Sequence, residues 1–246
     1  MDNSLLVSLS QQLAAFRAID VIANNIANAS TPGYKRESTK FEEYIAQMHP
    51  AEGETGSQSV SFVKDAGTMR DLAQGHMTQT GAPFDLAING KGFFAVQTPQ
   101  GLRYTRDGHF SLDANGQIVN SSGYALQGDG GAITITPDDG DIRIAPDGTV
   151  SGRTGQLAKV RVADFADEYA MVKQGANLYS TDQQAQTPAV IDIRQGALEG
   201  SNVQPVLEIS HMIEVMRAYE ATANLTKNQQ DMKRDAVEKL GAMPVS

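Results

Sequence analysis

The residues that could do chemistry do not form a recognisable catalytic set. The four histidines, His49, His76, His109 and His211, are not spaced as metal ligands, and His211 fits better as a packing residue of a helix. Neither a G-x-S-x-G elbow nor a P-loop occurs. Because the chain has no cysteine, disulfides, thiolate metal sites and cysteine nucleophiles are excluded. We therefore expect a protein that is not an enzyme and that uses no cofactor or metal.

Two weaker patterns are better explained by turns and strands. Residues 90–95 match a loose G-x-G-x-x-A, but a dinucleotide site needs a helix after the glycines, and residues 93–96 read as a strand. Asp138, Asp139 and Asp141 resemble a calcium loop, yet they lack the ligand spacing and the bidentate glutamate of an EF-hand. A solvated acidic turn is the better interpretation.

Residues 4–29 have the periodicity of a long helix. Apolar residues recur in steps of three and four, at Leu6, Leu9, Leu13, Phe16, Ile19, Ile22 and Ile26. The sequence Ser30-Thr31-Pro32-Gly33 then predicts the end of the helix, because proline cannot continue it and glycine tolerates a positive φ.

The other face of this helix carries short neutral side chains instead of the usual lysines and glutamates. Its charges are Arg17 and Asp20, and its polar residues include Asn24, Asn25 and Asn28 among many alanines. Such a face lets another helix approach closely, so we expect it to pack against neighbouring subunits, with the asparagines bonding across helices or to the turn after the helix. Burial within its own domain is the alternative, and for Asn28 simple helix termination is equally compatible.

A second helix is predicted from Pro205 to about Leu240. Proline suits its first turn, and helical spacing relates Val206, Ile209, Met212, Ile213, Met216 and Tyr219. The stretch 227–239 is strongly charged and is expected to fray or face solvent. Gly241 and Pro244 close the helix.

The chain between the helices reads as β-structure, from about 81 to 197. Asn89-Gly90 predicts a hairpin within 86–96, and turns are expected at 98–101, 113–116 and 146–148. Short strands separated by glycine-rich turns indicate an all-β domain. Residues 31–80 are neither clearly helix nor strand, and Glu52–Ser59 reads as a polar linker.

The predicted fold class is therefore α+β, with the terminal helices pairing as a coiled-coil-like layer around an inserted all-β domain. The predicted divisions are an N-terminal assembly helix (1–34), an extended linker or β arm (35–80), the β domain (81–200) and a C-terminal assembly helix (201–246). The formal net charge of −9 argues against nucleic-acid binding. We expect no membrane-spanning segment and no cleaved signal peptide.

Three segments resemble the flagellar rod and hook family. The first, 13–35, contains I-D-V-I-A-N-N-I-A-N-A followed by T-P-G-Y-K; the second, 81–127, contains F-D-L-A-I-N-G-K-G-F-F and Y-T-R-D-G; the third, 201–220, contains S-N-V and M-I-E-V-M-R-A-Y-E. Their order agrees with the family across nearly the whole chain. Residues 1–7 and the chain length resemble the proximal-rod type most, with the distal-rod type second.

The resemblance implies a structural subunit of the flagellar basal-body rod, exported without a cleaved signal through the flagellar type III channel and transmitting torque across the periplasm. Its implied partners are copies of itself and other axial proteins, including the distal rod protein, with contact to the cell wall. A distal-rod or hook-type axial protein, or a secreted β-domain binding protein, is the alternative. The residues expected at the assembly interface are Leu6, Leu9, Leu13, Phe16, Ile19, Ile22, Asn24, Asn25, Ile26, Asn28, Val206, Ile209, Met212, Ile213, Met216 and Tyr219.

Overall fold

The computed structural model describes residues 2–48 and 58–241. His49, Pro244 and most of the predicted linker Glu52–Ser59 lie outside this part. The chain divides into two compact units: a helical unit (Met1–Ala27, Glu37–Arg70 and Gln204–Ser246) and a β unit (Asn28–Arg36 and Asp71–Val203). The four divisions expected from the sequence stay predictions, and each unit is described by itself below.

Two long helices belong to the helical unit. Helix α1 spans Asp2–Ala27 and α2 spans Pro205–Gly241, so the charged end of α2 is helical, and its described side chains are mostly exposed. Leu5–Ala27 is long and apolar enough to cross a membrane by length and composition, with a hydropathy of 1.3. This property differs from the prediction that no segment is suited to span a membrane. One such helix is weak evidence for a span, because core helices of soluble proteins and signal sequences pass the same test.

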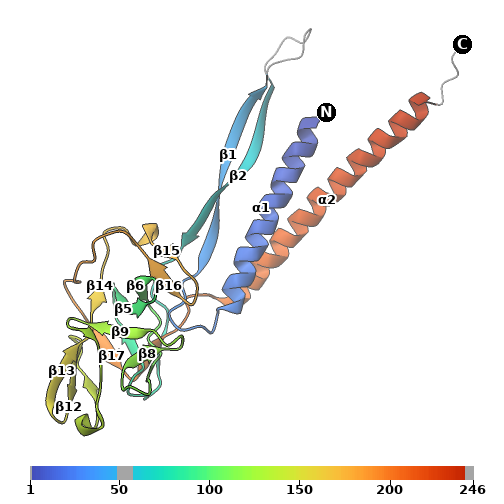
Figure 1. Ribbon diagram of the computed structural model, residues 1–246. Coiled ribbons are helices and arrows are strands. Elements are labelled where there is room, and N and C mark those ends of the chain that lie inside the picture. Colours follow the sequence, from blue (N-terminus) through green and yellow to red (C-terminus); the bar gives the residue numbers. More distant parts are fainter. Residues whose placement is uncertain (1, 49–57, 242–246) are drawn as a thin grey trace, which may run out of the picture. The chain divides into compact units, whose positions relative to one another are not determined.

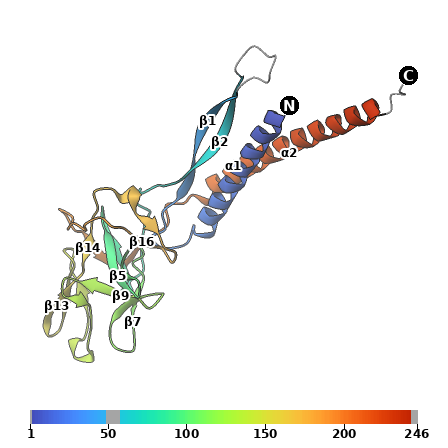
Figure 2. The same ribbon diagram turned by 45° about the horizontal axis from the view of Figure 1, so that its top comes forward.

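The two helices lie side by side and antiparallel within this unit (Figures 1 and 2). Near their middle, the rings of Phe16 and Tyr219 meet edge to face at 4.8 Å between centroids. Further along, Gln12 Nε2 donates to Thr226 Oγ1 at 3.2 Å. The α+β class is confirmed, whereas a coiled-coil-like layer stays a prediction.

A long β-ribbon completes the helical unit. Strands β1 (Glu37–Met48) and β2 (Gln58–Arg70) pair antiparallel from Glu37↔Arg70 to Met48↔Gln58, with a bulge after Thr39. Both strands contact α1. The sequence predicts only an extended linker or β arm for residues 35–80, because the mixed polar and apolar residues of this region do not alternate regularly as in a half-buried strand.

The β unit is built from antiparallel strands. Its nine-stranded sheet runs β15-β16-β6-β5-β9-β8-β7, with β10 on β9 and β14 on β5; β11-β12-β13 form a second sheet, and β17–β4 and β18–β3 are separate pairs. The strands are β3 Met77–Gln79, β4 Leu86–Ile88, β5 Phe93–Thr98, β6 Gly101–Thr105, β7 Phe110–Leu112, β8 Ile118–Asn120, β9 Ala125–Gly128, β10 Gly131–Ala132, β11 Arg143–Ile144, β12 Thr149–Gly152, β13 Gly155–Lys159, β14 Val162–Ala163, β15 Val172–Lys173, β16 Leu178–Ser180, β17 Ile193–Gln195 and β18 Ala197–Glu199. Two short 3₁₀ turns lie at Pro137–Asp139 and Glu168–Ala170.

An aliphatic core lies under this sheet. Five of its members are completely buried: Leu86, Phe94, Val96, Ile118 and Leu126. A smaller aromatic cluster on the other side includes Phe93, Tyr104, Phe165 and Tyr179. Side chains of β5 contribute alternately to the two clusters, as expected for a central strand covered on both faces.

The predicted hairpins have different outcomes. The turns at 98–101, 113–116 and 146–148 join the pairs β5–β6, β7–β8 and β11–β12, as predicted. The hairpin at Asn89-Gly90 is wrong, because β4 pairs with β17 and β5 pairs with β6, β9 and β14. Asn89 instead makes two hydrogen bonds to Asp192. Its backbone N–H donates to the Asp192 carbonyl at 2.8 Å, and its Nδ2 donates to Asp192 Oδ2 at 2.6 Å. These contacts direct β4 to β17.

Candidate functional site

Helix α1 exposes a row of large apolar side chains. Leu6, Leu9, Leu13 and Phe16 are 45%, 50%, 62% and 51% exposed. Steps of three, four and three residues keep them on one side of the helix. Isolated apolar residues at a surface are ordinary, but a contiguous row marks a contact surface.

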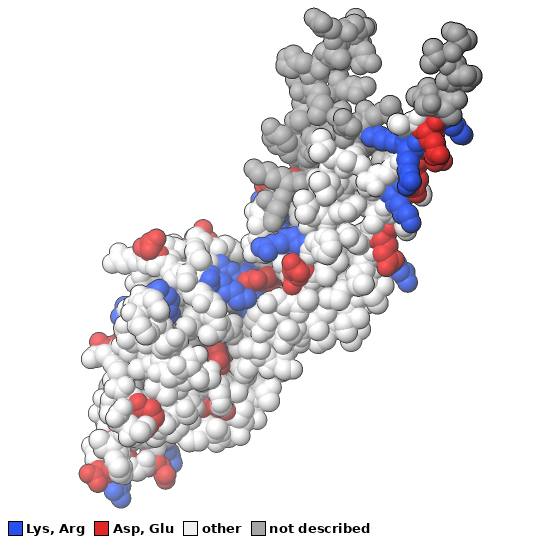
Figure 3. All heavy atoms as spheres, turned by 45° about the vertical axis from the view of Figure 1, so that its right-hand side comes forward, with Lys and Arg blue, Asp and Glu red and all other residues white. Residues whose placement is uncertain are grey.

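Helix α2 exposes a second row with the same spacing. Val206, Ile209, Ile213 and Met216 are 76%, 48%, 46% and 46% exposed. Each row is followed by an arginine and, three residues later, by an acidic residue: Arg17 and Asp20 on α1, and Arg217 and Glu220 on α2. We call the two rows the apolar stripes. In Figure 3 the charged atoms of α2 gather toward its end, beside a broad surface without them.

The other predicted interface residues are covered to different degrees. Ile22 and Asn25 are buried, Asn24 is exposed, and Ile19, Ile26, Asn28, Met212 and Tyr219 are half-buried. Thr31 makes two hydrogen bonds to Asn28. Its backbone N–H donates to the Asn28 carbonyl at 3.1 Å, and its hydroxyl donates to Asn28 Oδ1 at 3.2 Å. This geometry agrees with a role in helix termination.

Asn25 connects three elements of the helical unit. Its Nδ2 donates to the Glu37 carbonyl at 2.7 Å and to Glu208 Oε2 at 3.0 Å, while its Oδ1 accepts the Glu37 N–H at 3.0 Å. Asn25 is 0% and Glu208 2% exposed. The expected bond across helices is therefore present inside one chain, where it joins α1, β1 and the first turn of α2. Whether Ile22 and Asn25 also serve assembly stays a prediction.

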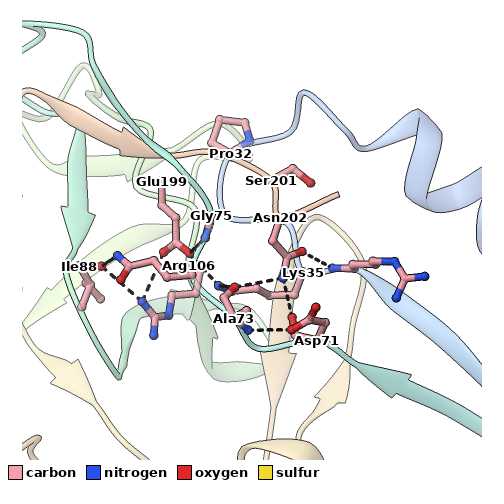
Figure 4. A network of polar contacts seen from close by, with 12 residues as sticks. Pro32, Lys35, Asp71, Ala73, Gly75, Ile88, Arg106, Glu199, Ser201 and Asn202 are labelled. Atoms are coloured by element: carbon pink, nitrogen blue, oxygen red, sulfur yellow. Dashed lines mark hydrogen bonds and ion pairs between the residues drawn. The ribbon is translucent and has the colours of Figure 1, made fainter. Parts of the chain in front are cut away.

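In the β unit, three buried charges from distant parts of the sequence meet (Figure 4). Lys35 Nζ lies 2.7 Å from Glu199 Oε1, and Arg106 Nη1 lies 3.3 Å from Glu199 Oε2. The three side chains are 2%, 1% and 5% exposed for Lys35, Glu199 and Arg106. Glu199 thus faces two cations where water cannot screen the charges.

Backbone groups complete the coordination of this triad. Lys35 donates to the Ala73 carbonyl at 2.9 Å, and the Gly75 N–H donates to Glu199 Oε1 at 3.1 Å. Arg106 Nη2 donates to the Gly90 carbonyl at 2.7 Å. Carbonyl oxygens therefore offset part of the excess positive charge, as buried ions require.

Asn202 holds the neighbouring backbone. Its Oδ1 accepts the Arg36 N–H at 2.7 Å, and its Nδ2 donates to the carbonyls of Asp71 and Ala73 at 2.8 Å and 3.0 Å. The Gly33 N–H donates to the Glu199 carbonyl at 2.8 Å. Segments 33–36, 71–75 and 199–202 are thereby fastened together within the β unit (Figure 4).

Burial dominates the electrostatics of the two cations. It lowers the pKa of Lys35, and the nearby Glu199 carboxylate opposes that change. Burial likewise lowers the pKa of Arg106 below its usual value, again opposed by Glu199. The triad is therefore a structural fastening that stays together because all three partners are present.

The three charged residues lie in or next to the motifs that resemble the family, but the sequence alone predicts no role for their side chains. Lys35 ends the T-P-G-Y-K motif, Arg106 lies in Y-T-R-D-G, and Glu199 directly precedes the S-N-V segment. One available signal was the position of Lys35 two residues after the Pro32-Gly33 turn, between an apolar helix and a polar stretch. Pairing of three separate motifs cannot be read from one sequence, because it is a long-range contact.

Asp138 and Asp139 lie in the short 3₁₀ turn Pro137–Asp139, and Asp141 follows it. Asp139 is buried, unlike the solvated turn expected, and its oxygens accept from the Thr154 hydroxyl at 2.6 Å and from the Thr136 hydroxyl and N–H at 2.7 Å and 2.8 Å. These donors, the Thr154 hydroxyl foremost, lower the pKa of Asp139. Among the described residues no group of three acidic or histidine side chains could hold a metal ion.

Comparison with known proteins places motifs from both units in one family. Residues 5–35 match the model described as flagella basal body rod protein, 87–152 the flagellar hook protein FlgE/F/G D1 domain, and 194–238 the flagellar basal body rod FlgEFG protein C-terminal region. Lys35, Arg106 and Glu199 each fall in a different one of these matches.

Several relatives are similar over nearly their full length. The flagellar basal-body rod protein FlgF of Caulobacter vibrioides is 45% identical, with 98% of this chain and 99% of that protein aligned. FlgF of Mesorhizobium japonicum is 36% identical with the same coverage. The rod protein FlgG of Buchnera aphidicola from Acyrthosiphon pisum is 34% identical over 87% of this chain and 90% of that protein.

Proposed function

Because this chain belongs to the flagellar basal-body rod proteins and is a structural protein rather than an enzyme, we propose that it joins the rod through its two apolar stripes. The partners are copies of this chain and other axial proteins of the basal body. The observation that carries the proposal is the exposure of eight large apolar side chains, in two rows with one spacing. The remaining predicted interface residues would flank these rows.

The energetics favour association of such surfaces. Fully burying a large aliphatic or aromatic side chain contributes roughly 1.5–3 kcal/mol, and side chains about half exposed retain about half of that for a partner. Helices of this length gain most of their stability from packing. Contact with neighbours would therefore both join subunits and complete the order of the terminal helices, which fits a mechanism of folding on assembly.

Similarity favours the proximal part of the rod. FlgF of Caulobacter is 45% identical, whereas the FlgG relatives reach 34%. The distal rod or a hook-type position is the alternative within the same family. We also propose that the subunit is exported without a cleaved signal, spans part of the periplasm within the rod, touches the surrounding cell wall and transmits torque through many shallow helix contacts.

The test places one charge in each stripe. Leu13→Asp and Ile213→Asp should abolish recovery of the protein with purified basal bodies, because a charge buried in an apolar contact is strongly unfavourable. Gln11→Asp and Asn224→Asp, at exposed positions outside the stripes, are the matched controls and should assemble. The β unit of all four variants should unfold as in the unaltered chain.

Normal incorporation of both stripe variants would refute the proposal. Loss of β-unit stability in the stripe variants would contradict the division between assembly helices and β unit. Recovery of the unaltered monomer with membrane vesicles, and not with basal bodies, would instead point to Leu5–Ala27 as a membrane segment.

A further inference from the structure

The dipeptide Asn-Gly occurs twice in the β unit, as Asn89-Gly90 between β4 and β5 and as Asn115-Gly116 in the β7–β8 turn. Asparagine is chemically vulnerable before glycine, because glycine has no side chain to hinder its own backbone nitrogen when that atom attacks the asparagine amide. Both asparagines are exposed. The reaction is therefore open to both by sequence, and a difference between the two sites must come from the fold.

The fold shields the reacting groups of Asn115-Gly116. The Gly116 N–H donates to the Asp113 carbonyl at 3.1 Å, and Asn115 Nδ2 donates to Asp113 Oδ2 at 3.2 Å. The backbone here is also crowded, because a Cβ built on Gly116 would collide with the Ile135 carbonyl oxygen. The Gly116 nitrogen can attack only after its hydrogen bond has been broken.

The backbone at Asn89-Gly90 is open instead. Gly90 is exposed, and no hydrogen bond joins its N–H to any residue in 2–48 or 58–241. A Cβ built on Gly90 would meet no atom within 4 Å. Asn89 Nδ2 is bonded to Asp192, so each asparagine side chain must first leave an aspartate. What separates the two sites is the glycine nitrogen, which is solvated at Gly90 and hydrogen-bonded at Gly116.

We propose that Asn89 is a site of spontaneous deamidation and that the fold protects Asn115 from the same reaction. The Gly90 nitrogen loses its proton to solvent base and attacks the side-chain carbonyl carbon of Asn89. A C–N bond closes a succinimide ring, and the side-chain nitrogen leaves as ammonia. Water then opens the ring to aspartate or isoaspartate, so the net change consumes one water and releases one ammonia.

The product disturbs the contact that directs β4 to β17. Oxygen replaces the Asn89 Nδ2 that now lies 2.6 Å from Asp192 Oδ2, so two carboxylates face each other and repel. Isoaspartate also lengthens the backbone just before Gly90, whose carbonyl accepts from Arg106 Nη2 at 2.7 Å. Deamidation thus loosens the β4–β17 pair and removes support from one member of the buried triad.

Ageing of the full-length protein in mildly alkaline buffer, followed by peptide mass spectrometry with an isoaspartate assay, tests the proposal. Asn89 should convert about two- to tenfold faster than Asn115, because the Gly116 hydrogen bond must be broken first. In concentrated urea the two rates should approach each other. Asp192→Ala releases the Asn89 side chain and should speed conversion of Asn89, with Asn115 as the unaffected internal control.

Conversion of Asn115 as fast as Asn89 in the folded protein would overturn the proposal. A difference that persists unchanged in urea would also overturn it, since local sequence and not the fold would then be the cause. The structural consequence is tested with Asn89→Asp, which should accelerate hydrogen exchange in β4 and β17, whereas Asn115→Asp should not. Unchanged exchange in Asn89→Asp would refute the assigned effect on the strand pair.

Discussion

Replacing Glu199 by glutamine would leave two buried cations without a counter-charge. Lys35 and Arg106 lie 2.7 Å and 3.3 Å from its carboxylate, and the three side chains are at most 5% exposed. Removing one partner of such a buried ion pair costs about 3–5 kcal/mol. For a chain of this size that predicts a fall in the melting temperature of the β unit of roughly 6–20 °C.

The comparison with Lys35→Met makes this prediction specific. That variant leaves Arg106 and Glu199 as a balanced pair, and Asn202 still donates to the Ala73 carbonyl that loses the lysine. Burial already disfavours the charged form of Lys35 by lowering its pKa. We therefore expect Lys35→Met to destabilise the β unit by less than half as much as Glu199→Gln.

The assay is urea unfolding in which the unfolded fraction is measured by hydrogen exchange. Peptides from β5 and β6 are analysed, because they report on the β unit alone. Asp182→Asn, at an exposed carboxylate, is the control and should stay within about 0.5 kcal/mol of the unaltered protein. A loss below about 1 kcal/mol for Glu199→Gln, or an equal loss for Lys35→Met, would show that charge balance does not govern the triad.

Three further predictions concern pH and backbone geometry. Because the pKa of Lys35 is lowered from 10.5, the folded protein holds fewer protons than the unfolded chain between that lowered pKa and 10.5; stability should therefore rise with pH in this window, and Lys35→Met should flatten the rise in alkaline urea titrations. The pKa of Asp139 is lowered from 3.8, so its stabilisation is present above 3.8 and is lost as pH falls through the lowered pKa; acid unfolding curves should show less of this loss in Asp139→Asn. Gly33→Ala should lower the stability of the β unit by more than about 2 kcal/mol, because φ is +66° and a Cβ would lie 2.4 Å from the Arg106 carbonyl carbon. Gly123 has a φ of +79° but open space around it. Thermal melts should therefore show a clearly smaller loss of stability for Gly123→Ala.

Local signals gave most of the secondary structure. Helical spacing from Leu6 to Ile26 predicted α1 to within two residues at each end, and Pro205 marked the first residue of α2. Turns such as 113–116 were predictable because their conformation depends on asparagine, aspartate and glycine at fixed positions.

What the sequence did not show are features decided by distant partners. Asn89-Gly90 has the composition of a hairpin turn, but Asp192 binds Asn89 and directs the strand elsewhere. The β1–β2 ribbon has α1 as its cover, so its own residues need not alternate. Asn25 was expected to bond across helices, but its partners Glu37 and Glu208 could not be named. The triad joins residues too far apart for any local pattern.

The β unit is discontinuous, and this limits how the protein can be cut or made. Lys35 and Glu199 are 164 positions apart, so a growing or threading chain cannot complete the β unit until residue 203 of its 246 residues has emerged. A fragment that starts at residue 71 lacks Lys35. A fragment that stops before residue 199 lacks Glu199 and leaves Arg106 buried without its carboxylate partner. A fragment that contains the whole β unit must begin by residue 28 and include residue 203. It therefore also contains the β1–β2 ribbon as an insertion between residues 36 and 71.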